Sequence, residues 1–64
     1  MAYSAIAYDN SVTLHGPNGS RQWKNECGGL RDVDVNAKAV IELALANPRV
    51  YDAFRYKVMK AMGR

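Results

Sequence analysis

Residues 11–25, which read SVTLHGPNGSRQWKN, decide the fold. Their centre, Gly16-Pro17-Asn18-Gly19, is the strongest turn signal of the chain, because proline and glycine favour the backbone angles that a tight turn requires. On either side, residues 11–15 and 20–25 have the pattern of short strands. A further run, residues 3–8, ends at the turn-forming pair Asp9-Asn10. Together these patterns predict a three-stranded antiparallel β-meander within residues 1–26.

The turn spacing predicts which side chains share a face of this sheet. A two-residue turn between the first two strands pairs Ala7 with Val12 and Ala5 with Leu14. The second turn closes on two residues or on four, and both registers place Trp23 on that same face. We expect this face to be the core. The opposite face then carries Ile6, Tyr8, Thr13, His15, Gln22 and Lys24, and it is unusually apolar at the first two.

The second half of the chain is predicted to be helical. Cys27-Gly28-Gly29 breaks the strand pattern within a loop over residues 27–33, and Asp34 or Asn36 can cap a helix that runs to about Ala46. Asn47-Pro48 ends that helix and starts a second one, with Pro48 at its first position. This second helix runs to about Met62, and Gly63 closes it. The chain is therefore predicted to be one small α+β domain of order β-β-β-α-α, with the helical pair over residues 34–64.

The second helix is amphipathic at the helical period of about 100° per residue. One arc holds Val50, Tyr51, Phe54, Val58, Ala61 and Met62, and it should cover the core. Met59 falls in the polar arc instead, near Tyr56. An apolar residue outside the buried arc is a candidate for contact with a partner.

The first helix is apolar around most of its circumference, through Val40, Ile41, Leu43 and Leu45. Two interpretations are open. Either its alanines widen the apparent apolar arc and three large residues face inward, or the helix carries a surface for self-association or for a partner. The second interpretation places Ile41 at an outward position.

Charge is distributed unevenly along the chain. The net charge is +3 over 64 residues, but residues 1–46 carry four basic and five acidic side chains. Residues 47–64 carry Arg49, Arg55, Lys57, Lys60 and Arg64 against Asp52 alone. Such a basic segment fits an anionic partner, or it complements a helix dipole and keeps a small protein in solution.

Several kinds of chemistry are not expected from these residues. Cys27 is the single cysteine and His15 the single histidine, which leaves no intrachain disulfide and no tetrahedral zinc set. Ser4 and His15 can meet across the first hairpin, but no carboxylate is placed to orient the imidazole. Asp32 and Asp34 are better explained by helix capping than by metal binding. We therefore expect no enzyme, no metal and no cofactor.

The cellular setting follows from the same composition. The N-terminal residues have no signal-peptide pattern, and the longest apolar run, residues 39–46, is too short to span a bilayer. A lone thiol suits a reducing compartment. The sequence thus predicts a cytoplasmic protein without a membrane partner.

Two classes of function remain. The first is a regulator or inhibitor that docks on a larger host protein or complex, of the size class of phage and mobile-element accessory proteins, through Ile6, Tyr8, Ile41, Tyr56 and Met59. The alternative is a nucleic-acid binder that uses a basic stripe of Arg49, Lys57, Lys60 and Arg64, with Arg55 at its margin. Homo-oligomerisation is left open. The sequence carries no motif that assigns it to a known family.

Overall fold

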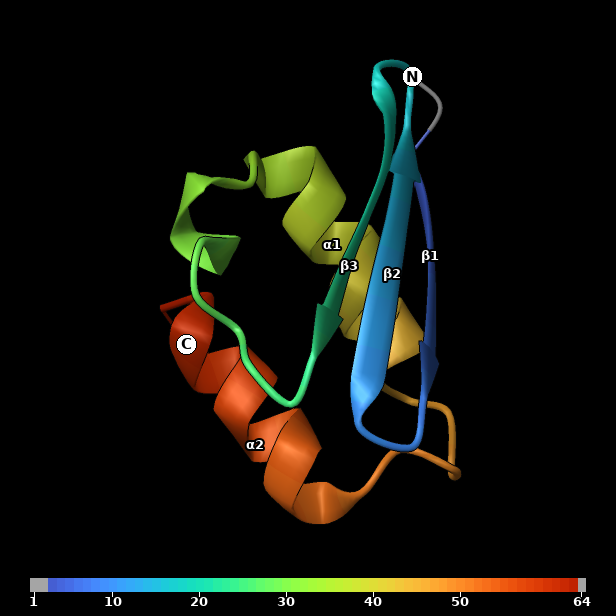
Figure 1. Ribbon diagram of the computed structural model, residues 1–64, viewed down its shortest axis with the longest axis vertical. Coiled ribbons are helices and arrows are strands. Elements are labelled where there is room, and N and C mark those ends of the chain that lie inside the picture. The colour runs from blue at the N-terminus through green and yellow to red at the C-terminus, as the bar shows by residue number, and fades with distance from the viewer. Residues whose placement is uncertain (1–2, 64) are drawn as a thin grey trace.

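A computed structural model of the chain describes residues 3–63 (Figure 1). Strands β1 (Ser4–Tyr8), β2 (Ser11–Gly16) and β3 (Gly19–Lys24) form an antiparallel sheet in the order β1-β2-β3. A short 3-10 turn η1 (Leu30–Asp32) precedes helices α1 (Val35–Ala44) and α2 (Asp52–Ala61). The predicted α+β class and the β-β-β-α-α order are confirmed.

The sheet has the expected register. Ala5 pairs with Leu14, Ala7 with Val12, and Val12 with Trp23. Gly16 pairs with Gly19, so the second turn closes on two residues rather than four. All five of the predicted core-face residues pack into or against one core, which confirms the assignment of the faces.

Helix α1 begins where a side chain supplies its missing N-terminal acceptor. Asp34 is the capping residue, and its carboxylate accepts a 2.9 Å hydrogen bond from the Ala37 backbone N–H. The adjacent Ala37 and Ile41 are buried on one face, Leu45 is buried just beyond the helix, and Val40 is half-buried against the same core. Three large residues therefore face inward, as one interpretation of this helix holds.

The position of Ile41 differs from the other interpretation, in which this residue belongs to an outward contact surface. Its exposed fraction is 0%, so it belongs to the core and does not face outward. Leu43 of α1, which is 76% exposed, is an apolar residue that does face outward. The alanines of this helix leave its apolar arc so broad that periodicity alone does not separate these two positions.

The start of the second helix also differs from the prediction. Pro48 is not its first residue, because α2 begins at Asp52 with Tyr51 as the capping position. Residues 47–50 form a turn in which the Asn47 side-chain oxygen accepts from the Arg49 N–H, and Val50 then bridges Asp9 of the sheet. Tyr51 consequently lies outside the buried arc and is 59% exposed.

The rest of the apolar arc is as expected. Phe54 and Val58 are buried on α2, Met62 is buried just after it, and Val50 is buried ahead of it. Gly63 follows the helix with a φ of 86°, the left-handed angle of a glycine that ends a helix. Both helices lie on one side of the sheet (Figure 1), and no helix covers its other side among residues 3–63.

Candidate binding surface

The outward face of the sheet carries side chains from all three strands, and we call these nine residues the open sheet face. Its rows, from the hairpin tip of β2 and β3 to the opposite end, are Ser4–His15–Ser20, Ile6–Thr13–Gln22 and Tyr8–Ser11–Lys24. Among residues 3–63, no helix covers this face. The face exists because alternate residues of a strand point to opposite sides and the helices cover one side.

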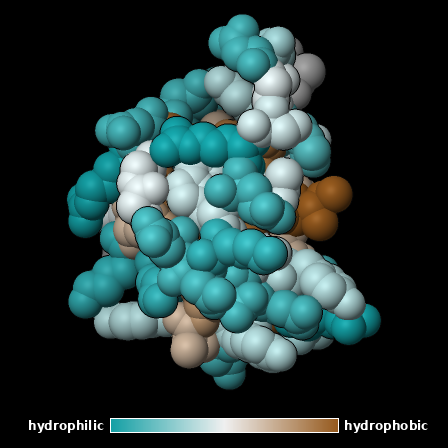
Figure 2. Space-filling model, in the orientation of Figure 1, coloured by the Kyte–Doolittle hydropathy of each residue, from teal (hydrophilic) through white to brown (hydrophobic). Residues whose placement is uncertain are grey.

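The apolar centre of the open sheet face lies on β1. Ile6 is 62% exposed and Tyr8 is 43% exposed, although exposure of apolar surface to water is unfavourable. Figure 2 shows a strongly apolar patch protruding on the β1 side of the molecule. A pair of large apolar side chains exposed on a rigid sheet is a feature of contact surfaces.

Arg49 completes this patch from outside the sheet. Its guanidinium carbon lies 4.5 Å from the centre of the Tyr8 ring, in the geometry of a cation–π contact. The contact exists because residues 49–51 run beside Asp9, where the Asp9 N–H donates to the Arg49 carbonyl at 3.0 Å. Sequence reasoning missed this pairing, since Arg49 was assigned to a helix.

Polar contacts hold the remaining side chains of the face in place. The Nδ1 atom of His15 lies 2.7 Å from the Ser20 hydroxyl oxygen, and the Gln22 amide donates to the Thr13 hydroxyl at 3.2 Å. Ser4 is the strand neighbour of His15 on its other side, as expected. His15 thus has a serine partner on β3, and its position amid hydroxyl and amide groups suits hydrogen bonding to a surface laid across the strands.

Arg49 does not lie on α2 with the other described basic residues of the C-terminal segment. It lies beside the open sheet face, with its guanidinium over the Tyr8 ring, and Arg64 lies outside the described residues. On α2, Lys57 donates to the Asn25 carbonyl at 3.1 Å, and the Lys60 ammonium lies 5.5 Å from the centre of the Tyr56 ring. The predicted stripe required one helix from Pro48 onward, and the later start of α2 removes Arg49 from it.

Arg55 has a structural position that the sequence interpretation missed. Its guanidinium donates to the carbonyls of Leu45, Asn47 and Val50 at 2.8, 3.2 and 3.0 Å, and it forms an ion pair with Asp52. These carbonyls belong to the C-cap of α1 and to the segment that follows it, so the arginine links α2 to the end of α1. The available signal was the need for hydrogen-bond donors where α1 ends.

The remaining predicted contact residues lie on other surfaces. Tyr56 is 66% exposed on α2, whereas Met59 is half-buried against the core. The exposed Leu43 and Val35 of α1 were not among the predicted residues. Of the predicted set, the structure brings together Ile6 and Tyr8.

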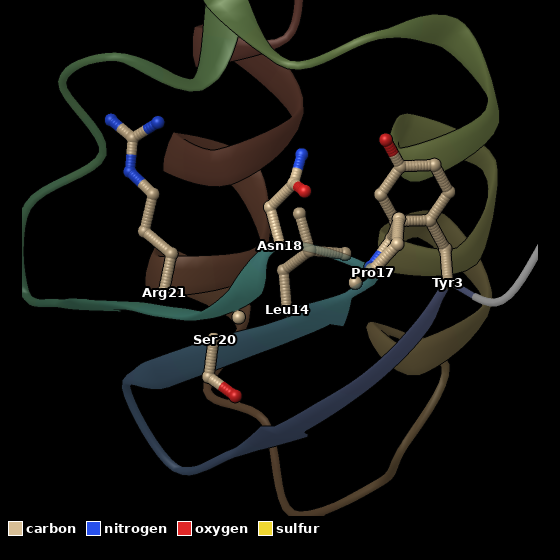
Figure 3. A pocket seen from close by; sticks show the side chains of 8 residues that line it. Tyr3, Leu14, Pro17, Asn18, Ser20 and Arg21 are labelled. Carbon is tan, nitrogen blue, oxygen red and sulfur yellow. The ribbon is translucent and has the colours of Figure 1, made fainter.

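A shallow hollow lies at the tip of the second hairpin (Figure 3) and has a volume of about 310 Å³. Figure 3 places Tyr3 and Arg21 on opposite sides of it, with Leu14 and Asn18 between them. Tyr3 donates to the Asp34 carboxylate at 2.8 Å, and the Arg21 guanidinium lies over the Trp23 ring at 4.6 Å. Both polar side chains are therefore engaged with the protein itself.

Hydrogen bonds shift the pKa values of two ionisable side chains in this region, Tyr3 and Asp34. The bond to Asp34 is the main reason that the pKa of Tyr3 is raised. The pKa of Asp34 is lowered, first by the Ala37 N–H and then by the Tyr3 hydroxyl, because both donate to its charged form. This pair fixes the start of β1 to the start of α1.

Cys27 is buried, and burial raises the pKa of its thiol. The thiolate is the reactive form of cysteine, so this shift makes the side chain a poor nucleophile at neutral pH. Within residues 3–63, no group of three metal-binding side chains comes together. Over the same residues, no helix has the length and apolarity to cross a membrane.

Comparisons with known proteins add no identification, since no family model, curated protein or solved structure matches the chain.

Proposed function

We propose that this chain is a small regulator that docks its open sheet face on a larger protein. The observation that carries the proposal is the exposure of Ile6 and Tyr8 beside each other on β1, with the Arg49 guanidinium over the Tyr8 ring. Tyrosine and arginine are enriched among residues that dominate binding energy, and a rigid strand holds them without loss of backbone entropy on binding.

The charges of the face indicate the chemistry of the partner. The nine residues of the open sheet face include Lys24 and no acidic residue, and Arg49 adds a second cation at the rim. Opposite charges steer two proteins together and suppress binding to like-charged surfaces. We therefore infer a partner surface with an apolar centre and an acidic rim.

The size of the chain favours action by occupation of a surface. A stable interface buries roughly 800 Å² on each partner, whereas the whole chain exposes 4135 Å². Docking would thus cover roughly a fifth of this protein. A chain that binds in this way inhibits or redirects its partner, as small accessory proteins of phages and mobile elements do. The free thiol of Cys27 supports a reducing compartment such as the cytoplasm.

A capture experiment with matched variants tests the proposal. The tagged chain is incubated with cell lysate, treated with nuclease, washed at moderate salt, and its bound proteins are identified. A discrete protein should be retained by the unmodified chain and by Leu43→Ser, but lost with Ile6→Ser and Tyr8→Ser. Leu43 is the control because it is more exposed than either and lies on α1. Equal retention by all three variants would refute docking through the sheet.

Nucleic-acid binding is the second candidate, and one observation favours it. Lys57 and Lys60 lie three residues apart on α2, are both exposed, and thus share a side of the helix. If they contact phosphates, the double variant Lys57→Glu, Lys60→Glu should bind nucleic acid more weakly and lower the salt slope by about one per lost contact. An unchanged slope would remove α2 from consideration.

A further inference from the structure

The two border strands of the sheet differ in what their backbones contact. In an antiparallel ladder, alternate residues direct their N–H and C=O groups to the same neighbour. The Asn25 N–H donates to the Asn10 carbonyl at 3.0 Å, so the odd-numbered residues of β3 face β2. Ser20, Gln22 and Lys24 therefore direct their backbone groups away from the sheet.

These outward groups have no partner among residues 3–63. No hydrogen bond reaches the backbone of Ser20, Gln22 or Lys24 from the described residues outside β2, and all three are exposed. In Figure 1, β3 forms one border of the sheet and no further strand lies beside it. Such a border accepts an extended peptide as an additional strand.

The charges along β3 decide which peptide it accepts. Arg21 and Lys24 are basic, no residue of β3 is acidic, and the nearest acidic residue in the sequence is Glu26. Arg21 is held on the helix side of β3, because its guanidinium lies over the Trp23 ring and against Gly29. A second copy of the chain would bring the same two cations to the border again, and like charges on neighbouring strands repel.

We propose that β3 binds an extended acidic segment of the partner protein, which adds as a fourth strand of the sheet. This inference rests on the proposed function, since the segment belongs to the partner that covers the open sheet face. The backbone of the segment pairs with Ser20, Gln22 and Lys24. Its carboxylates lie near Arg21 on the helix side of the sheet and near Lys24 on the open side. The same cations that oppose pairing with a second copy select for acidic strands.

The test uses two synthetic peptides and the full chain. The acidic probe is acetyl-Thr-Glu-Glu-Val-Glu-Glu-Thr-amide, which presents carboxylates to both faces of the sheet, and the control probe has lysine at each glutamate position. NMR titration at low salt should show shifts at Ser20, Gln22 and Lys24 with the acidic probe, and binding of the lysine probe should be at least about tenfold weaker. Added salt should narrow that difference.

Two variants of the chain at position 22 isolate the contribution of the β3 backbone to peptide binding. Gln22→Pro removes one outward N–H at a border position where proline is tolerated, and Gln22→Thr keeps that N–H. Binding of the acidic probe should weaken with proline and persist with threonine. An acidic probe that carries N-methyl groups on the alternate residues whose N–H groups face β3 should also fail to bind the unmodified chain, and this result does not depend on the folding of a variant.

The outcomes separate this inference from the proposed function. Ile6→Ser should bind the acidic probe as well as the unmodified chain does, because the probe pairs with β3 and not with β1. Equal binding of the two probes, shifts confined to other elements, or dimerisation of the chain through β3 would overturn the acidic-strand assignment. Partner capture that depends on Ile6 but survives Gln22→Pro would overturn it as well, while the docking proposal would stand.

Discussion

One border strand of the sheet, β1, is covered by another segment of the chain, whereas the other, β3, is not covered within the described part of the chain, although the two strands are similar in length. The β1 border is covered by residues 45–51, the linker between α1 and α2. The Asn47 amide donates to the Ala7 carbonyl at 2.9 Å, and the Asp9 carbonyl accepts from the Tyr51 N–H at 3.0 Å. No equivalent segment covers the β3 border within residues 3–63. The linker therefore protects one border, whereas charge is the protection that remains on the other.

This difference shows how a short chain uses its connecting segments. Val50 is buried at 3% exposure, and its bridge to Asp9 holds the linker against β1. The same segment positions Arg49 over Tyr8. The covered border thus organises the patch on the open sheet face, and the uncovered border stays available for pairing.

Breaking the covered border should have the largest effect. Val50→Asp buries a carboxylate in the core, and its expected cost of about 4 kcal/mol or more is comparable with the whole stability of a domain this small. The variant should be unfolded at room temperature by circular dichroism. Gln22→Asp introduces the same charge at the uncovered border and should stay folded. A folded Val50→Asp variant would show that the linker does not need the buried Val50 side chain to stay against β1.

A pair of proline variants sharpens the description of β3, with a smaller effect. Arg21→Pro removes an N–H that faces β2, which breaks a ladder hydrogen bond, and should cost about 2 kcal/mol or more of unfolding free energy. Gln22→Pro removes an N–H that faces solvent and should cost about 1 kcal/mol or less. Chemical denaturation followed by Trp23 fluorescence measures both, and Arg21→Thr controls for the lost contact with Trp23. Equal costs for the two prolines would contradict the register.

The tie between β1 and α1 should give the smallest effect, as a dependence of stability on pH. The pKa of Asp34 is lowered in the folded protein, so its contribution is present above the ordinary aspartate pKa and is lost as pH falls through the folded value. Asp34→Asn should therefore reduce the loss of stability between about pH 5 and pH 2. Thermal melts at several pH values measure this, with Asp32→Asn as the control. An unchanged acid dependence in Asp34→Asn would contradict the assigned role.

The parts of this structure that follow local rules were predictable from the sequence. The Gly16–Gly19 turn fixes where two strands meet, and alternation then places Val12 and Trp23 inside and Ile6 and Tyr8 outside. The cap at Asp34 follows from the same kind of local chemistry.

The errors come from contacts between residues that are distant in sequence. Pro48 has the local signature of a helix start, but the bridge from Val50 to Asp9 keeps residues 47–50 out of the helix. The Arg49–Tyr8 contact was missed for the same reason. Ile41 and Leu43 are similar in size and hydrophobicity, and the way α1 packs on the sheet decides which of them is buried.

Hydrogen–deuterium exchange of the free chain tests the central claim most directly, which is that the sheet has one covered and one uncovered border. The amides of Asp9 and Tyr51 should be protected, since both donate within the linker contact, and those of Arg21 and Trp23 should be protected by β2. The amides of Ser20, Gln22 and Lys24 should exchange at nearly the rate of an unfolded peptide. Protection of these three equal to that of Arg21 and Trp23 would mean that the β3 border is covered in solution, and would contradict the account.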